Sequence, residues 1–184
     1  MYHIIMGHHQ DPHSQYMMEK LARRGLAAHL FETHDFPRSV QFAFSPNTGD
    51  GHLILNDGSH LPFNEIKSVY WRNFCGVTDE STKQNFTTID DISARDSMAC
   101  LRTWFDLSNQ TIWLNSWQAF QHHKEKPLQL FKVSNLGVNI PQTYVGNDLD
   151  EIQRCYSAFG KSIFKPVFGG AHTEILTDAH LESG

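Results

Sequence analysis

Residues 114–170 read LNSWQAFQHHKEKPLQLFKVSNLGVNIPQTYVGNDLDEIQRCYSAFGKSIFKPVFGG, and they place two lysines in unusual backbone settings. Lys126 precedes Pro127, which suits the first turn of a helix, and Gly137 suits the end of that helix. A lysine at the positive end of a helix dipole is unfavourable unless an anion lies close by. Lys165 lies in a predicted strand, on a face that it shares with apolar side chains. Both positions therefore predict contact with a phosphate.

A pair of glycines, Gly169 and Gly170, follows the second lysine closely. Glycine lets the backbone approach a ligand, so the amides of such a loop can donate to phosphate oxygens. The alternative is that Lys165 extends to solvent at a strand edge and that the glycines form an ordinary hairpin turn. The sequence has neither a GxxxxGKS/T loop nor a GxGxxG turn after its first strand, so the common nucleotide fingerprints are absent. On the residues alone, both interpretations of Lys165 stay open.

The residues before this stretch predict an α/β fold. Residues 2–6 and 26–33 are typical of strands, and the helix between them is capped by Asp11, begins at Pro12 and ends at Gly25. Such a βαβ unit favours a parallel sheet. Further elements are expected as strands at residues 66–74 and 111–115, a helix at residues 91–107 and a hairpin around Asp57 and Gly58. Beyond residue 137 they are an extended segment at residues 138–145, a capped helix at residues 148–160 and paired strands at residues 162–167 and 173–176.

The composition is that of a folded, globular chain. Its 184 residues are 40% hydrophobic and 19% charged, and the formal net charge is −5. A negative balance argues against a general nucleic-acid or anionic-membrane binder, because both need a basic face. The three cysteines are far apart, which favours neither a disulfide framework nor a cysteine-based zinc site. Without a signal peptide or an apolar run near the ~20 residues of a membrane helix, we expect a cytoplasmic protein.

Polar side chains follow two of the predicted strands. His8, His9 and His13 come after the first strand, and Arg72 lies in the strand at residues 66–74. Ligands of open α/β sheets bind beyond the carboxyl ends of the strands, so these residues are candidate substrate contacts. Arg72 suits either a substrate carboxylate or a pairing with a neighbouring acid. For the histidines, solvent-facing roles are favoured over a metal site, because adjacent histidines in regular structure point in different directions.

Several landmarks in residues 114–170 occur in the order of a known family. They are an asparagine after a strand, a lysine before a helix, a segment of the form LGxx(I/V)PxT, a lysine in a strand and a glycine-rich flap. In this sequence they are Asn115, Lys126, residues 136–143, Lys165, Gly169 and Gly170. The order resembles the ATP-grasp carboxylate ligases, in the branch of ribosomal-protein glutamate ligases and macrocycle-forming peptide maturases. Upstream, EIKSVYWRNF at residues 65–74 resembles the Trp-Arg strand in the pre-ATP-grasp domain of the peptide maturases.

The resemblance implies two domains. Residues 1–114 are expected to form a Rossmann-like pre-ATP-grasp domain with a mostly parallel sheet, and residues 115–184 an incomplete α+β nucleotide-binding lobe. Lys126 and Lys165 are expected to contact ATP, with Gly169 and Gly170 as the flap. ATP acts with Mg²⁺ in the family, and the Mg²⁺ ligands lie in later sequence that these 184 residues do not contain. We therefore expect no metal ligand in this chain, and no catalytic residue is assigned.

The expected function is that of the amino-terminal portion of an ATP-dependent ligase. In the family, ATP converts a carboxylate to an acyl phosphate, which an amine or hydroxyl attacks to form an amide or ester. The expected partners are ATP and a peptide or amino-acid carboxylate, and exposed sheet edges favour a homo-oligomer. Without the metal site, the chain is expected to be inactive alone. The alternatives are a non-catalytic nucleotide- or peptide-binding module of the same architecture and, less favoured, a flavodoxin-like domain.

Overall fold

The computed structural model of the chain describes residues 1–74, 77, 89–167 and 172–182. The chain divides into two compact units, Met1–Trp117 and Gln118–Gly184. The predicted flap residues Gly169 and Gly170 lie outside the described residues. The predicted domain boundary between residues 114 and 115 stays a prediction, because a division by compactness does not define a family domain.

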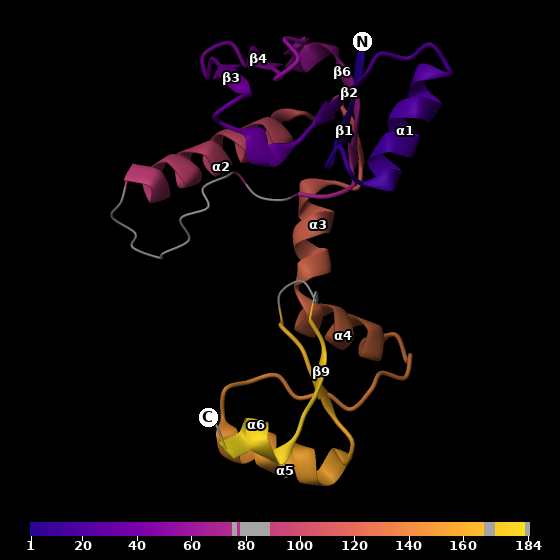
Figure 1. The fold of residues 1–184 in the computed structure, drawn as a ribbon, viewed down its shortest axis with the longest axis vertical. Helices are drawn as coiled ribbons and strands as arrows, with labels where there is room; N and C mark the ends of the chain where they lie inside the picture. Colours follow the sequence, from indigo (N-terminus) through magenta and orange to yellow (C-terminus); the bar gives the residue numbers. More distant parts are fainter. Residues whose placement is uncertain (75–76, 78–88, 168–171, 183–184) are drawn as a thin grey trace. The chain divides into compact units, whose positions relative to one another are not determined.

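A four-stranded sheet with the order β2-β1-β6-β7 lies at the centre of the first unit, and all its pairings are parallel. Its strands are β1 (Tyr2–Met6), β2 (Ala28–Phe31), β6 (Ile66–Trp71) and β7 (Ile112–Leu114). Figure 1 shows α1 (Pro12–Ala22) on one side of this sheet and α2 (Ile89–Leu107) on the other. Helices on both faces bury the central strand, so Ile4, Ile5 and Met6 are all at most 1% exposed. The predicted α/β class and the parallel βαβ unit are confirmed.

The turn between β1 and α1 is shaped by two local requirements. Asp11 has an extended backbone, and its carboxylate accepts from the amide of His13 at 3.4 Å, which caps the helix before Pro12. At Gly7, an added Cβ would lie 2.2 Å from Ser14 Oγ, so a larger residue there would displace this buried hydroxyl. These requirements hold residues 7–11 at the carboxyl end of the sheet.

A second, antiparallel sheet in the same unit has the order β3-β4-β5. Its strands are β3 (Gln41–Phe44), β4 (Gly51–Ile54) and β5 (His60–Pro62), and short 3-10 helices lie at Thr33–Asp35 and Phe63–Glu65. The predicted hairpin joins β4 to β5: the Ser59 amide donates to Asp57 Oδ1 at 2.9 Å, and Gly58 has a φ of 83°. β3 was not predicted from the sequence.

The core of the first unit forms where α2 meets aromatic side chains of the strands and loops. Leu101, Trp104 and Phe105 of α2 are at most 5% exposed. The Trp104 ring stacks on Phe63 at a centroid distance of 5.6 Å and lies 6.2 Å from Phe31. The helix predicted at residues 91–107 is therefore confirmed, and its carboxyl-terminal half packs into the core. Among the described residues, no helix is both long enough and apolar enough to cross a membrane.

The second unit is built from short elements with little interior. They are α3 (Trp117–Lys124, whose first residue belongs to the first unit), α4 (Lys126–Asn135), α5 (Leu149–Phe159), β8 (Ile163–Phe164), β9 (Glu174–Ile175) and α6 (Asp178–Glu182). The predicted cap of α5 is confirmed, because the Asp148 carboxylate accepts from the amides of Asp150 and Glu151. In the part of this unit that the structure describes, no residue is buried.

One predicted strand of the second unit is shorter in the structure. The strand expected at residues 162–167 is limited to Ile163–Phe164, although its antiparallel pairing with β9 is confirmed. Pro166 has no amide hydrogen to donate, so the ladder stops before it and Lys165 lies just past the strand. Residues 138–145, predicted to be extended, are assigned to neither a helix nor a strand, and Pro141 lacks the amide donor that strand pairing would need there.

Candidate functional site

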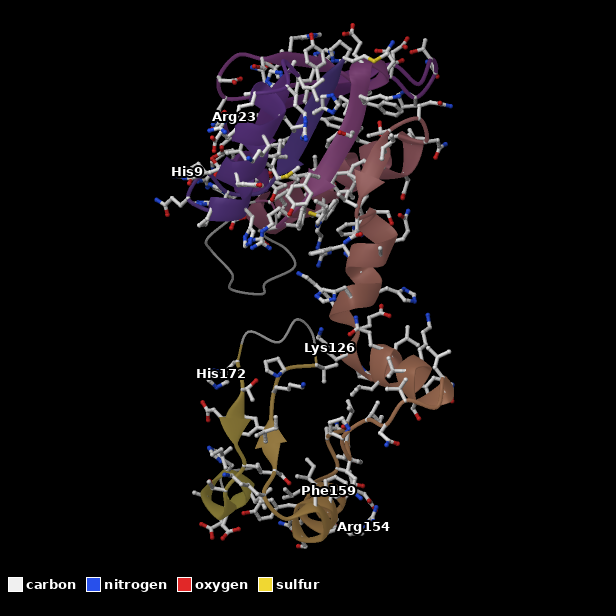
Figure 2. All side chains as sticks on the ribbon, turned by 90° about the vertical axis from the view of Figure 1, so that its right-hand side faces the viewer. His9, Arg23, Lys126, Arg154, Phe159 and His172 are labelled. Carbon is white, nitrogen blue, oxygen red and sulfur yellow. The ribbon has the colours of Figure 1, made fainter. Side chains whose placement is uncertain are left out.

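Lys126 is the first residue of α4, the place where the sequence predicts a phosphate contact. Its ammonium donates to the carbonyl oxygen of His123 at 3.3 Å, and it forms no ion pair with any described residue. No side chain caps the helix at Glu125, so the first amides of α4 lack a side-chain acceptor. These amides carry partial positive charge. The start of α4, where Figure 2 labels Lys126, therefore offers two kinds of donor to an anion.

An open hollow with a volume of ≈ 460 Å³ lies between α3 and the start of α4, lined by Gln118, Ala119, His122, His123 and Gln129. The Gln129 amide group donates to the carbonyl oxygens of His122 at 3.2 Å and His123 at 2.8 Å. Lys132 Nζ lies 2.7 Å from His122 Nε2, with the ammonium as the donor. Hydrogen bonds thus fix the two helices against each other next to Lys126.

Lys165 follows β8 directly, and its side chain is exposed. It makes no hydrogen bond or ion pair with another described residue. Lys165 and Lys126 belong to the same compact unit, while the predicted flap, Gly169 and Gly170, lies outside the described residues. The ammonium of Lys165 is therefore available to a ligand, and its contact with ATP stays a prediction.

At the carboxyl ends of β1 and β2, Glu32 joins two of the predicted histidines. Its carboxylate accepts from the His9 amide at 2.8 Å and lies 2.9 Å from His9 Nδ1, and His8 Nε2 is 3.7 Å away. Burial would raise the pKa of Glu32, but the hydrogen bonds from His9 and the charges of His9 and His8 hold it below its ordinary value. Figure 2 shows His9 at the outer edge of this unit. The histidines therefore surround an ionised carboxylate.

The rings of His8 and His9 are stacked, with a centroid distance of 4.4 Å and an interplanar angle of 28°. Both residues lie in the turn after β1, where the alternation of a strand no longer separates neighbouring side chains. Adjacent histidines in a regular strand point in different directions, but His8 and His9 are not in a strand, so this reason against a shared metal site does not apply to them. His34, in the 3-10 helix after β2, places its ring 5.5 Å from that of His8. Two imidazoles thus lie beside Glu32, and a third, that of His34, lies beside His8.

Arg72 is held by an acid of the chain itself. Its Nε lies 2.9 Å from Asp11 Oδ2, and a terminal nitrogen lies 2.9 Å from His13 Nδ1. Asp11 also accepts from the Ser14 hydroxyl at 3.1 Å. Burial would raise the pKa of Asp11, but hydrogen bonds from His13 and Ser14 and the charge of Arg72 lower it. Of the two interpretations of Arg72, the structure shows the pairing with a neighbouring acid.

Neither acid of this sheet edge, Asp11 or Glu32, was predicted from the sequence as a site residue. Asp11 is identified there only as a helix cap, and Glu32 is not singled out. A signal was present for Glu32, because it comes directly after the second parallel strand, as the histidines come after the first. Parallel neighbours end at the same edge of a sheet, so an acid in this position lies close to them.

The comparisons with known proteins agree with the α/β fold. Residues 3–121 match the family model described as the MvdD pre-ATP grasp domain. The ATP-grasp ligase PsnB complexed with minimal precursor superposes with a TM-score of 0.75 at 24% identity, over 98% of this chain and 58% of that chain. PsnB complexed with a phosphomimetic variant of minimal precursor, Mg and ADP gives 0.76 at 24% identity, over 98% and 59%.

A third solved structure is similar over the whole of this chain. The macrocyclase MdnC bound with precursor peptide MdnA from Microcystis aeruginosa MRC has a TM-score of 0.77 and 20% identity, over 100% of this chain and 64% of that chain. The chain thus spans less than two thirds of the length of each of these three chains. Among curated proteins, the sequence has no match. The resemblance to the amino-terminal portion of an ATP-grasp peptide maturase is confirmed.

Proposed function

This chain belongs to the family of the MvdD pre-ATP-grasp domain, and from that premise we propose that it serves an ATP-dependent ligase acting on a peptide. The observation that carries the proposal is the family match over residues 3–121, followed in sequence by a lysine at an uncapped helix start. PsnB, a structural relative, is described in complex with precursor, Mg and ADP, and MdnC in complex with a precursor peptide. ATP and a peptide are accordingly the proposed partners.

Lys126 and Lys165 are the proposed contacts to the triphosphate of ATP. Both ammonium groups lack an acidic partner among the described residues, so each is free to neutralise phosphate charge. Lysine suits this role as a compact point charge, and the first amides of α4 add hydrogen-bond donors for an anion. Gly169 and Gly170 are proposed as the flap over the phosphates, on the basis of sequence alone. The residues of the second unit thus fit a nucleotide phosphate.

The described residues of the second unit do not fit Mg²⁺. This ion prefers several oxygen ligands in near-octahedral geometry. Glu174 is already engaged by His172 and His180, and no described residue after Lys126 belongs to a group of three that could hold a metal ion. We therefore assign the Mg²⁺ that accompanies ATP in the family to ligands other than these residues.

The proposed reaction proceeds through an acyl phosphate. A carboxylate oxygen of the peptide attacks the γ-phosphorus of ATP, the bond from that phosphorus to the bridging oxygen breaks, and ADP leaves. An amine or hydroxyl then attacks the carbonyl carbon and loses its proton, and inorganic phosphate leaves with formation of an amide or ester. Lys126 and Lys165 would hold the phosphates and offset the charge that builds up on them.

One observation favours the second candidate function, a non-catalytic nucleotide- or peptide-binding module. No metal-binding group is present in the described part of the second unit, although the nucleotide lysines are. A module with this set of residues binds a nucleotide without transferring its phosphate. Turnover distinguishes the two candidates, because only a ligase consumes ATP in proportion to its product.

The test is a turnover assay on the complete protein with ATP, Mg²⁺ and peptides that carry acidic side chains beside lysine, serine or threonine. The ligase proposal predicts that ADP and phosphate are released in proportion to a peptide product lighter by one water, detected by mass spectrometry. Lys126→Ala and Lys165→Ala should lower the rate. ATP binding without any peptide-dependent release of phosphate would support the binding module and contradict the ligase.

A further inference from the structure

We propose that His8, His9 and Glu32 form a binding site for a divalent transition-metal ion of the Zn²⁺ type. Each residue offers one ligand atom, and these atoms all lie within 4.8 Å of one another. The site belongs to the first unit and is separate from the lysines assigned to ATP. Metal binding at this site is therefore proposed in addition to the ligase chemistry, and the proposal does not depend on that chemistry.

The parallel sheet brings these residues together. β1 and β2 are adjacent and in parallel register, with Met6 opposite Phe31, so the chain leaves both strands at the same edge. Glu32 follows β2 directly, and the turn after Gly7 carries the two histidines back over it. A bond from the His9 amide to Glu32 at 2.8 Å fixes the turn against the carboxylate. The backbone itself thus preorganises the cluster.

The distances suit a small tetrahedral ion. Ligand atoms about 2.0–2.1 Å from Zn²⁺ in tetrahedral geometry lie about 3.4 Å from one another. In the structure, Glu32 Oε1 is 2.9 Å from His9 Nδ1 and 3.7 Å from His8 Nε2, on either side of that value. Because the two imidazole rings are stacked, one of them must turn about its side-chain bonds before all three atoms can face the same ion.

The donor set selects the class of metal. Two imidazole nitrogens and one carboxylate are ligands of Zn²⁺, Co²⁺, Ni²⁺ and Cu²⁺, whereas Mg²⁺ and Ca²⁺ prefer oxygen alone. Three protein ligands leave a fourth position for water or for the carboxylate of a ligand. Parallel α/β sheets bind their ligands beyond this edge of the sheet. The fourth coordination position of the metal therefore lies in the region where a ligand is expected.

Burial and charge also favour a cation here. The Glu32 side chain is 12% exposed, so its negative charge is held in a region of reduced solvation, and the side chains of His8 and His9 are 32% and 58% exposed. The guanidinium of Arg72, which follows β6 at the same edge, is already paired with Asp11. A divalent ion would compensate the charge of Glu32 more strongly than the two imidazoles do.

Metal binding requires a change in where the ring protons lie. His9 Nδ1 is within hydrogen-bond distance of Glu32, so its proton moves to Nε2, which faces solvent, when the metal takes the lone pair. His8 Nδ1 accepts from the Gln10 amide at 3.1 Å, which leaves the proton of a neutral ring on Nε2. That proton must move to Nδ1, and the amide of the exposed Gln10 then turns to water. Each imidazole stays neutral and keeps one proton throughout.

The test measures Zn²⁺ binding to the 184-residue chain without a polyhistidine tag, by isothermal titration calorimetry and by metal analysis after dialysis. Wild type is expected to bind one equivalent, and Glu32→Gln and His9→Ala are expected to bind at least about tenfold more weakly. His52→Ala is the matched control, because His52 is paired with another histidine, His60, on the antiparallel sheet. That variant should bind like wild type.

Stability provides a second readout that does not depend on calorimetry. Zn²⁺ should raise the unfolding temperature of wild type and of His52→Ala but not of His9→Ala. An ion that binds the folded protein stabilises it, and His9→Ala lacks one of the ligands. The His9 side chain is exposed, so its removal leaves the core intact. The proposal is overturned if wild type shows no saturable binding, if Glu32→Gln and His9→Ala bind as tightly as wild type, or if loss of His122 and His123 abolishes binding instead.

Discussion

The charged residues at the carboxyl edge of the parallel sheet are held by one another. Arg72 is bound by Asp11, and Glu32 by His9. Pairs of this kind position groups rather than add much stability, because partly exposed ion pairs contribute about 0–1 kcal/mol. Lys126 and Lys165 differ from them, since neither has an acidic partner among the described residues. At the scale of single residues, these two cations mark the proposed nucleotide site, and the paired acids mark the sheet edge.

Asp57 should make the stability of the first unit depend on pH. Hydrogen bonds from the Ser59 amide and hydroxyl lower the pKa of Asp57. Burial acts in the opposite direction, and the charge of His29 adds to the lowering. A lowered pKa stabilises the fold above the pKa of the unfolded chain, about 3.9, and this contribution is lost as the pH falls through the folded value. The free energy of unfolding of wild type should therefore exceed that of Asp57→Asn at neutral pH, and the difference should shrink below about pH 4.

Urea unfolding followed by circular dichroism over this pH range measures the effect. Asp50→Asn is the control, because it removes a carboxylate from the neighbouring turn and leaves the Asp57–Ser59 contact in place. The prediction is contradicted if the free energies of unfolding of wild type and Asp57→Asn differ by the same amount from neutral pH to acid. The turn would then not stabilise the ionised carboxylate.

Trp104 should be the most costly side chain to remove from α2. It is 1% exposed and contacts Phe31, Phe63 and Trp113. Truncation of a buried aromatic residue leaves a cavity, and Trp104→Ala is expected to lower the free energy of unfolding by about 3–5 kcal/mol. Leu107→Ala, on the same helix but 55% exposed, should change it by about 0.5 kcal/mol or less. Similar losses in the two variants, measured by chemical unfolding, would contradict this account of the core.

At the scale of elements, α5 depends on its amino-terminal cap. The Asp148 carboxylate accepts from Asp150 at 3.1 Å and Glu151 at 3.3 Å, and no residue of the helix is buried. Asp148→Ala should therefore destabilise the first turn by about 1 kcal/mol, which speeds amide hydrogen exchange there about fivefold. Ser157→Ala, near the end of the same helix, is the control. Unchanged exchange in Asp148→Ala would mean that other contacts hold the helix.

Elements with strong local signals could be predicted from the sequence, and those that depend on pairing could not. The βαβ unit, the hairpin at Asp57 and the capped helix α5 are encoded by apolar period, turn residues and caps. β3 has no such signal of its own and is defined by its partner β4. The strand around Lys165 was predicted too long, because the lost donor of Pro166 outweighed the apolar pattern.

The candidate site was predictable to the same extent. Strand ends placed His8, His9 and Arg72 at one edge of the sheet, since parallel neighbours end together. Glu32 has the same strand-end signal as the histidines, but neither it nor Asp11 stands out by that signal alone, because an acid after a strand or before a helix most often faces solvent. The stacking of the two histidine rings required the turn geometry of residues 7–11, which no period in the sequence specifies.

At the scale of the whole molecule, the two units differ in how much they bury. The first has a core of aliphatic and aromatic residues, whereas the described residues of the second expose Phe131, Ile163 and Ile175 at 64%, 59% and 53%. Burial of apolar side chains is the main favourable contribution to folding. The first unit therefore has an interior of its own, and the second has apolar surface that suits contact with further protein.

This difference predicts that the first unit folds without the second. A chain of residues 1–121, the span up to the end of the family match, should unfold cooperatively on heating, with a midpoint within about 5 °C of the 184-residue chain. Residues 122–184 alone should show no cooperative transition, because their described side chains have no buried core. Differential scanning calorimetry of both fragments and of the 184-residue chain measures these transitions. A cooperative transition in residues 122–184, or none in residues 1–121, would contradict this division.

The central claim is that the lysines of the second unit bind the phosphates of ATP, and nucleotide titration tests it most directly. Isothermal titration of the 184-residue chain with a non-hydrolysable ATP analogue should give saturable binding. Loss of one charge-assisted contact corresponds to about 1.5–3 kcal/mol, so Lys126→Ala and Lys165→Ala should each weaken binding by about tenfold or more. Lys161→Ala, an exposed lysine four positions before Lys165, should bind like wild type. Equal affinity in wild type, Lys126→Ala and Lys165→Ala would contradict the account.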